Sequence, residues 1–143
     1  MTVARILASK GRDVATIEPT RTLLEAARML SERRIGSLVV TGPDRSILGI
    51  LSERDIVHVV SRSGPEALQQ ALGDHMTRKV ITCTPTSGIN ELMETMTRGK
   101  FRHLPVIENG RLAGIVSIGD VVKHRVAEIE SEHQALREYI ASA

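Results

Sequence analysis

The second half of the chain repeats the first, and this internal symmetry limits the possible folds more than any other property. A shift of 66 positions superimposes identical residues in the two copies. These pairs are Val14 and Val80, Thr16 and Thr82, Pro19 and Pro85, Thr20 and Thr86, Glu25 and Glu91, and Val40 and Val106. After a gap of one residue the pairs continue as Gly49 and Gly114, Ile50 and Ile115, Ser52 and Ser117, and Asp55 and Asp120. Two copies of one folding unit explain this register.

Each copy is predicted to form a strand, a helix, two strands and a second helix. An extended segment ends at Pro19 or Pro85, and apolar residues at helical spacing follow. These are Leu23, Ala26, Ala27 and Leu30 in the first copy and Ile89, Leu92, Met93 and Met96 in the second. Paired apolar runs joined by a turn predict hairpins, Ser37–Val40 with Ile47–Leu51 and Leu104–Ile107 with Leu112–Val116. A second helix begins after Ser52 or Ser117, so that the predicted fold class is α+β, with an α/β-like alternation of elements.

Neither unit is large enough to bury much core alone, so we expect the two to pack as one pseudo-twofold body. The predicted domains are residues 1–62, with an N-terminal lead-in helix, and residues 80–125. A linker, residues 63–79, carries a short helix that begins at Gly64-Pro65-Glu66. Residues 126–143 form a C-terminal helix.

Composition argues against several classes of protein. Lys and Arg exceed Asp and Glu by only two charges, and 1% of the residues are aromatic, which argues against a nucleic-acid-binding surface. Cys83 is the only cysteine, so no internal disulfide is expected, and the five histidines show no metal-ligand spacing. No apolar run reaches the roughly 20 residues that span a bilayer. Without a signal-peptide pattern, the expected location is the cytoplasm.

The repeat contains two related heptapeptides, Gly49-Ile50-Leu51-Ser52-Glu53-Arg54-Asp55 and Gly114-Ile115-Val116-Ser117-Ile118-Gly119-Asp120. They resemble the signature of CBS domains, named after cystathionine beta-synthase, and Arg102-His103-Leu104-Pro105-Val106 resembles a strand of the same family. The resemblance extends over residues 1–125 and is closest to stand-alone pairs of CBS domains, called Bateman modules. It implies a regulatory module that binds an adenine nucleotide, AMP above all, or ADP, ATP, NAD or S-adenosylmethionine. The regulated partner is not identified.

The heptapeptides offer a chemical basis for nucleotide binding. Ser52 and Ser117 lie at the N-cap of a helix, where free N–H groups attract phosphate. Asp55 and Asp120 follow one turn later, where a carboxylate can accept both ribose hydroxyls. The structural alternative is that serine and aspartate simply cap the helix.

Candidate phosphate ligands are Arg54, the pair Arg102 and His103, and the Lys10-Gly11-Arg12 segment. In the first copy Ser37 stands where His103 stands in the second, so the first cleft lacks the Arg–His pair. Lys10 and Arg12 are expected to compensate, because Ser9-Lys10-Gly11 is an insertion before the first copy alone. The alternative for any one of these cations is a solvated surface charge.

The resemblance also implies which residues surround the adenine. They are Thr16 and Ile17, Leu38 and Val39, Thr82 and Cys83, and Leu104 and Pro105. Because Pro105 cannot donate a ladder hydrogen bond, it is expected at a strand edge or end. For Cys83 taken alone, the ordinary role is a packed thiol.

The sequence pattern of the C-terminal helix predicts that the protein forms a homodimer. Alternating spacings of four and three residues form a heptad seam of Val122, Val126, Ile129, His133, Leu136 and Ile140. The alternative is that the helix folds back onto its own module. Two other functions remain open at this stage, a nucleotide-processing enzyme and a nucleic-acid-binding protein, although no catalytic set of residues supports the first.

Overall fold

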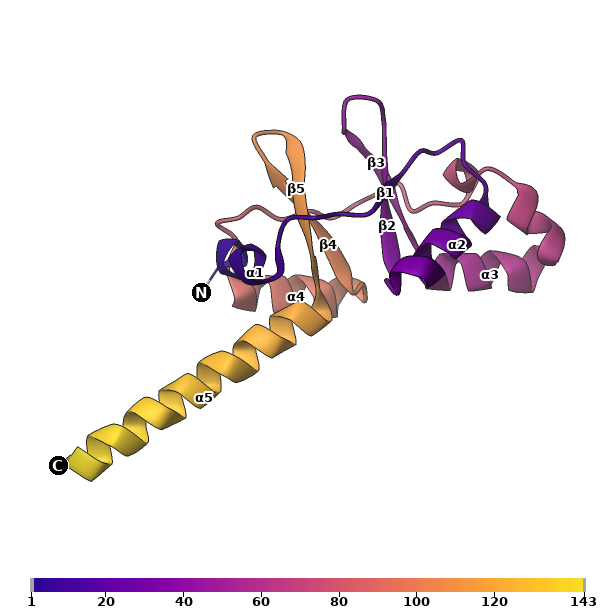
Figure 1. Ribbon diagram of the computed structural model, residues 1–143. Coiled ribbons are helices and arrows are strands. Elements are labelled where there is room, and N and C mark those ends of the chain that lie inside the picture. Colours follow the sequence, from indigo (N-terminus) through magenta and orange to yellow (C-terminus); the bar gives the residue numbers. More distant parts are fainter. Residues whose placement is uncertain (1, 143) are drawn as a thin grey trace.

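Two similar units lie side by side in the structure, and a long helix projects from one of them (Figure 1). This computed structural model describes residues 2–142, so the first residue of the predicted range 1–62 and the last of 126–143 lie outside it. The first unit contains β1 (Thr16–Ile17), α2 (Leu23–Arg33), β2 (Ser37–Thr41), β3 (Ile47–Ser52) and α3 (Glu53–Ser63). The second contains α4 (Ile89–Gly99), β4 (His103–Glu108), β5 (Arg111–Ser117) and α5 (Ile118–Ser142). The α+β prediction is confirmed.

Three short helical elements lead into or join the units. They are α1 (Val3–Lys10) and the 3₁₀ turns η1 (Pro65–Gln69) and η2 (Leu72–Asp74). The linker helix predicted at Gly64-Pro65-Glu66 is therefore present as a 3₁₀ turn, with Pro65 in its first position. Between residues 2 and 142, no helix combines the length and the apolar character that crossing a bilayer requires.

The repeat sets the register of the strands. In the first sheet, β1 runs parallel to β2 with Ile17 opposite Val40, and β2 is antiparallel to β3. In the second unit, Cys83 forms a parallel bridge with Val106, which is the pair equivalent to Ile17 and Val40. The hairpins also share an irregularity, between Val40 and Thr41 and between Val106 and Ile107.

The first strand expected in the second unit is reduced to this single bridge. In the first unit, the Val39 N–H donates to the Ala15 carbonyl at 3.1 Å. The equivalent of Val39 is Pro105, which has no N–H to donate, so the ladder stops at Cys83. Pro105 was expected at a strand edge or end. It lies inside β4, opposite Ile115, and β4 is an edge of its two-stranded sheet, so the predicted edge is confirmed and the strand end is not. The nitrogen of Pro105 faces the segment that would otherwise form the third strand.

The two units exchange their lead-in segments. Val3, Ile6 and Leu7 of α1 are buried in the apolar core of the second unit, although the chain runs from α1 into the first. Leu72 and Met76, which precede the second unit in sequence, are buried in the core of the first. The N-terminal helix predicted as part of the first domain therefore packs with the second. This exchange ties the units together by apolar burial and continuous chain.

Candidate functional site

Two clefts lie where the units meet. The Asp55 cleft has a volume of about 540 Å³ and the Lys10 cleft of about 550 Å³, each named after a residue that lines it. Both volumes are in the range of small-molecule sites. Residues of both units line each cleft, and some line both: Gly36, Ser37, His103 and Ser117. The clefts are thus neighbours that share their inner wall.

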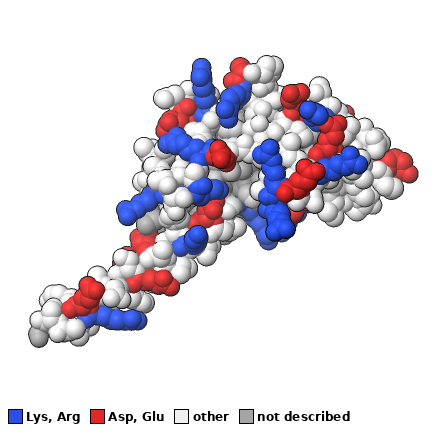
Figure 2. All heavy atoms as spheres, in the orientation of Figure 1, with Lys and Arg blue, Asp and Glu red and all other residues white. Residues whose placement is uncertain are grey.

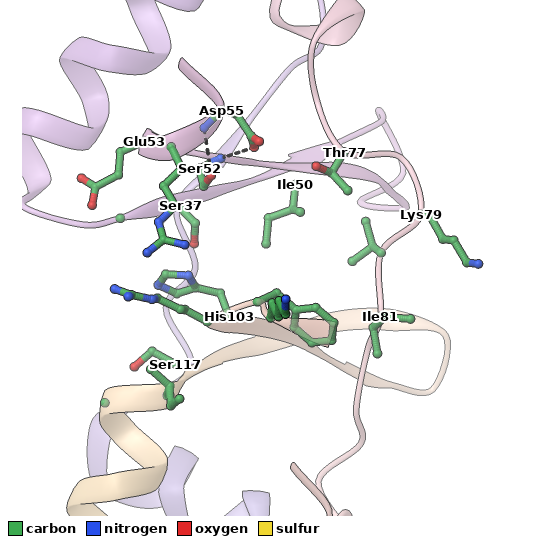
Figure 3. Close-up of a pocket in the computed structure, with 18 residues that line it drawn as sticks. Ser37, Ile50, Ser52, Glu53, Asp55, Thr77, Lys79, Ile81, His103 and Ser117 are labelled. Atoms are coloured by element: carbon green, nitrogen blue, oxygen red, sulfur yellow. Dashed lines mark hydrogen bonds between the residues drawn. The ribbon is translucent and has the colours of Figure 1, made fainter. Parts of the chain in front are cut away.

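The Asp55 carboxylate is held by the first turn of α3 (Figure 3). Its Oδ2 accepts the Ser52 N–H at 2.8 Å, and Ser52 Oγ accepts the Asp55 N–H at 3.2 Å. Ser117 and Asp120 repeat these bonds at the start of α5, at 2.9 and 3.1 Å. Both aspartates therefore do cap helices. The second oxygen of the Asp55 carboxylate has no hydrogen-bond partner in residues 2–142 and is available to a ligand.

Basic side chains surround the Asp55 cleft. Arg54, Lys79, Lys100 and Arg102 line it, and they come from both units. Lys79 turns its amine away from the cavity, toward solvent (Figure 3). In the space-filling view, Lys and Arg side chains gather at the junction of the units with acidic side chains beside them (Figure 2). The cleft can therefore attract an anion.

Ser37 and His103 face each other where the two clefts meet (Figure 3). A Cβ on Gly36 would lie 3.4 Å from Cε1 of His103, so the imidazole packs directly on this glycine. Ser37 is 6% exposed, and its hydroxyl has no hydrogen-bond partner in the described part of the chain. Burial, with a smaller contribution from Lys10, lowers the pKa of His103 below its usual value of 6.5. The ring is therefore neutral at pH 7.

The Lys10 cleft differs because an ammonium group covers its aspartate. Lys10 Nζ donates to Asp120 Oδ2 at 2.7 Å and to the Ile115 carbonyl at 3.0 Å. In the other copy, the Ile50 carbonyl accepts a backbone N–H, that of Thr77, at 2.9 Å. Asp55 lines its cleft, whereas Asp120 is absent from the lining of the Lys10 cleft. The insertion Ser9-Lys10-Gly11 is what breaks the symmetry.

Two opposing effects set the pKa of the Asp120 carboxyl. Partial burial raises it, but the hydrogen bonds from Lys10 and from the Ser117 backbone lower it more, so that the pKa falls below its ordinary value of 3.8. The carboxylate is ionised and paired at neutral pH.

Arg12 lies apart from both clefts. Its guanidinium contacts Glu108 Oε1 at 3.3 Å, and both side chains are largely exposed. Of the two cations expected to compensate for the missing Arg–His pair, only Lys10 lies in a cleft. Because Lys10 ends α1 while Arg12 follows the turn at Gly11, the two side chains separate.

Most residues predicted to surround adenine lie behind the clefts. Leu38, Val39, Leu104, Pro105 and Cys83 are buried in the strands and cores, and none of them lines either cleft. Burial, followed by the nearby Glu91, raises the pKa of the Cys83 thiol to about 11.

The remaining predicted base contacts also lie outside the linings of both clefts. Thr16 and Ile17 line a separate hollow beside Pro19 and Arg21, and Thr82 is exposed.

The apolar walls are made instead by residues just upstream of those predicted. Val14 and Ala15 line the Lys10 cleft, and the equivalent Val80 and Ile81 line the Asp55 cleft. Their identical spacing from Pro19 and Pro85 was the available signal, because the repeat aligns these positions. Val80, Ile81 and Ile50 give the Asp55 cleft an apolar surface that suits a flat base.

Residues 2–142 contain no group of three or more His, Cys, Asp or Glu side chains that could hold a metal ion.

Comparison with known proteins agrees with this architecture. The sequence pattern of the CBS domain matches residues 4–62 and 72–127. A mitochondrial CBS domain-containing protein of Arabidopsis thaliana is 35% identical over 147 residues, which cover 97% of this chain and 71% of that protein.

Solved structures extend the comparison to the fold. A CBS-domain containing protein of Agrobacterium tumefaciens is 50% identical with a TM-score of 0.85, over 87% of this chain and 99% of that one. A CBS domain protein of Pyrobaculum aerophilum, solved in complex with AMP, is 28% identical with a TM-score of 0.75, over 84% and 89% of the two chains. With its two matched repeats and this shared fold, the chain belongs to the CBS domain family as a tandem pair of domains.

Proposed function

We propose that this chain is a regulatory module that binds an adenine nucleotide at the junction of its CBS units. AMP is the first candidate, with NAD, ADP and ATP as alternatives. The nucleotide acts as a signal of energy state in the cytoplasm, and the clefts bind it without catalysis. The AMP complex of the P. aerophilum protein supports this class of ligand.

The observation that carries the proposal is the unpartnered hydroxyl of Ser37. A buried hydroxyl without a hydrogen bond costs about 1–3 kcal/mol. A buried polar group without a hydrogen bond needs an explanation, and a ligand that supplies the missing hydrogen bond would explain the Ser37 hydroxyl. Ser37 lies beside His103, among the cations of the Asp55 cleft. A phosphate group at this point would satisfy the hydroxyl and neutralise the surrounding charge.

With the phosphate beside Ser37, the positions of the ribose and the base can also be proposed. The free oxygen of Asp55 accepts the ribose hydroxyls, while Val80 and Ile81 cover the base. Arg54 and Arg102 are within the same lining and pair with the phosphate. The positive end of the α3 helix dipole adds favourable potential for the phosphate.

The two clefts are not equivalent in this proposal. A ribose that enters the Lys10 cleft must compete with the ammonium of Lys10 for Asp120, whereas Asp55 has no such partner in the described residues. We expect the Asp55 cleft to bind AMP more tightly. In a calorimetric titration, Asp55→Asn should then remove the tighter binding, and Asp120→Asn should leave it in place.

Ser37→Ala tests the central contact. The full chain is titrated with AMP, and its thermal stability is measured without ligand. We expect about tenfold weaker binding from the loss of one hydrogen bond to phosphate. The stability without ligand should stay equal or rise, because the substitution removes an unsatisfied buried group. Ser131→Ala, on the exposed part of α5, is the matched control.

Two results would refute the proposal. The first is the absence of any binding to the unmodified chain at millimolar AMP, NAD, ADP or ATP. The second is AMP binding that neither Ser37→Ala nor Asp55→Asn weakens, since the ligand would then lie elsewhere.

We also propose that two copies associate. Val57 on α3 and its repeat equivalent Val122 on α5 are 68% and 48% exposed. Further along α5, Leu136 and Ile140 are exposed by 57% and 66%. A second copy would bury these exposed apolar side chains, and exposed apolar surface of this kind marks an interaction site.

A further inference from the structure

The C-terminal part of α5 projects from the body of the protein (Figure 1). Val121, near the start of the helix, is fully buried, whereas every residue from Ile129 to Ser142 is exposed. An isolated helical segment of this length is marginally stable in water. A partner that covers one face would stabilise it.

The projecting part carries one apolar seam. Val126, Ile129, Leu136 and Ile140 are spaced as the a and d positions of a heptad, and they are between 37% and 66% exposed. His133 occupies the remaining a position. This pattern matches a two-stranded coiled coil better than a helix that packs against a sheet, which needs a wider apolar stripe.

The charges beside the seam identify the partner and its direction. In a parallel pair of identical helices, Arg125 of one copy lies beside Glu130 of the other, and Glu132 lies beside Arg137. Twofold symmetry repeats both contacts on the other side of the seam, and all of these flanking pairs are of opposite charge. Both signs of charge are visible along the projecting helix (Figure 2).

The antiparallel arrangement over the same seam brings like charges together. Glu130 would face its own copy, and Lys123 would face Arg137. Such pairs oppose association. We propose that the α5 helices of two copies of this chain form a parallel, in-register coiled coil. The inference rests on the proposed homodimer and is independent of nucleotide binding.

His133 gives the coil its register. In the parallel arrangement, the imidazole of one copy faces that of the other across the seam. A polar side chain at one a position lowers stability but fixes register and strand number. Any shift by one heptad would place His133 against Val126 or Ile140 and leave both imidazoles without a polar neighbour.

Charge reversal on the full chain tests the direction, with the dimer constant measured by sedimentation equilibrium. Arg137→Glu should weaken a parallel dimer roughly tenfold, because two opposite-charge contacts become like-charge contacts. In the antiparallel pair the same change would relieve the repulsion from Lys123 and tighten the dimer. Adding Glu132→Arg to Arg137→Glu should restore the parallel dimer. Glu138→Arg, on the outward face, should change little.

Disulfide trapping provides a second measurement. Ile140→Cys places the same residue of both copies face to face in a parallel coil, so oxidation should give a covalent dimer. In the full antiparallel pair these residues would lie roughly 27 Å apart along the helix axis. The native Cys83 is buried and should not contribute.

The outcomes separate the two proposals. A chain that stays monomeric at tens of micromolar overturns both the homodimer and the coil. A dimer that Arg137→Glu tightens or leaves unchanged, or that Ile140→Cys fails to link, overturns the parallel coil and leaves the homodimer standing.

Discussion

Lys10 Nζ lies 2.7 Å from Oδ2 of Asp120, although 110 residues separate the two in sequence. The pair joins the end of α1 to the first turn of α5. Its side chains are 32% and 24% exposed, so solvent screens it only in part. It closes the Lys10 cleft over Asp120 and marks the main chemical difference between the two copies of the repeat.

Replacing Lys10 by Met should destabilise the protein in a pH-dependent way. The pKa of Asp120 is lower in the folded protein than its ordinary value of 3.8. The stabilisation is therefore present above pH 3.8 and is lost as the pH falls through the folded pKa. We expect Lys10→Met to reduce the free energy of unfolding by about 1 kcal/mol at pH 7. Urea unfolding at a series of pH values should show the difference shrinking in acid.

Arg12→Met is the control for this substitution, because the Arg12–Glu108 pair is 54% and 42% exposed. Its effect should stay within a few tenths of a kcal/mol. Two outcomes would show that the Lys10–Asp120 ion pair does not stabilise the fold. One is a decrease in the free energy of unfolding for Lys10→Met that is unchanged at pH 2, and the other is a decrease no larger than that for Arg12→Met.

Gly49→Ala and Gly114→Ala should differ although the repeat makes the two positions equivalent. A Cβ on Gly49 would lie 2.7 Å from Met76 Sδ and 2.8 Å from the Thr77 carbonyl oxygen. A Cβ on Gly114 would meet only the end of the Leu7 side chain, at 2.8 Å. The backbone carbonyl cannot move aside, whereas a leucine side chain can. We expect a cost of about 2–3 kcal/mol at Gly49 and about 1 kcal/mol at Gly114. Equal melting temperatures for the two variants would contradict this ranking.

The thiol of Cys83 should be unreactive in the native protein. The side chain is 7% exposed, and burial raises its pKa to about 11, so the reactive thiolate is scarce at pH 8. An aromatic disulfide reagent should label it only after urea unfolds the chain. Labelling of the native protein at the rate of a free thiol would show that the second unit opens readily.

The secondary structure could be predicted from the sequence because each element is specified locally and specified twice. Ser52 and Asp55 begin a helix through their own hydrogen bonds, and Ser117 and Asp120 repeat them. Pro105 was predicted at an edge because it cannot donate a ladder hydrogen bond, and β4 is an edge of its two-stranded sheet. The local argument did not predict that the same loss reduces the neighbouring strand to the single bridge at Cys83.

The sequence predicted site residues correctly only where the position of a residue within its own strand or helix turns its side chain toward the junction of the two units. Ser37 and His103 begin their strands there, and both line the clefts. Leu38 and Leu104 follow them directly, but the next residue of a strand points to the opposite face, into the core. The burial of α1 in the second unit depends on long-range packing, which no local pattern encodes.

Nucleotide binding should draw a proton onto His103. Without ligand, burial and then Lys10 lower the pKa of this imidazole, while Asp120 and Glu53 act in the opposite direction. His103 therefore lowers the free energy of unfolding as the pH falls below 6.5, because its imidazole binds a proton more readily in the unfolded chain than in the folded protein. A phosphate beside Ser37 would favour the charged ring and raise its pKa.

AMP should then bind more tightly at pH 6 than at pH 8, and binding near pH 6.5 should take up a fraction of a proton. Calorimetry in two buffers of different ionisation enthalpy measures that uptake. The phosphate itself takes up a proton near pH 6. The comparison is therefore made with His103→Gln, for which the contribution of the imidazole is gone and that of the phosphate remains. Equal proton uptake by the two proteins would mean that the phosphate does not lie against His103, and the ligand orientation proposed for the Asp55 cleft would have to be reversed.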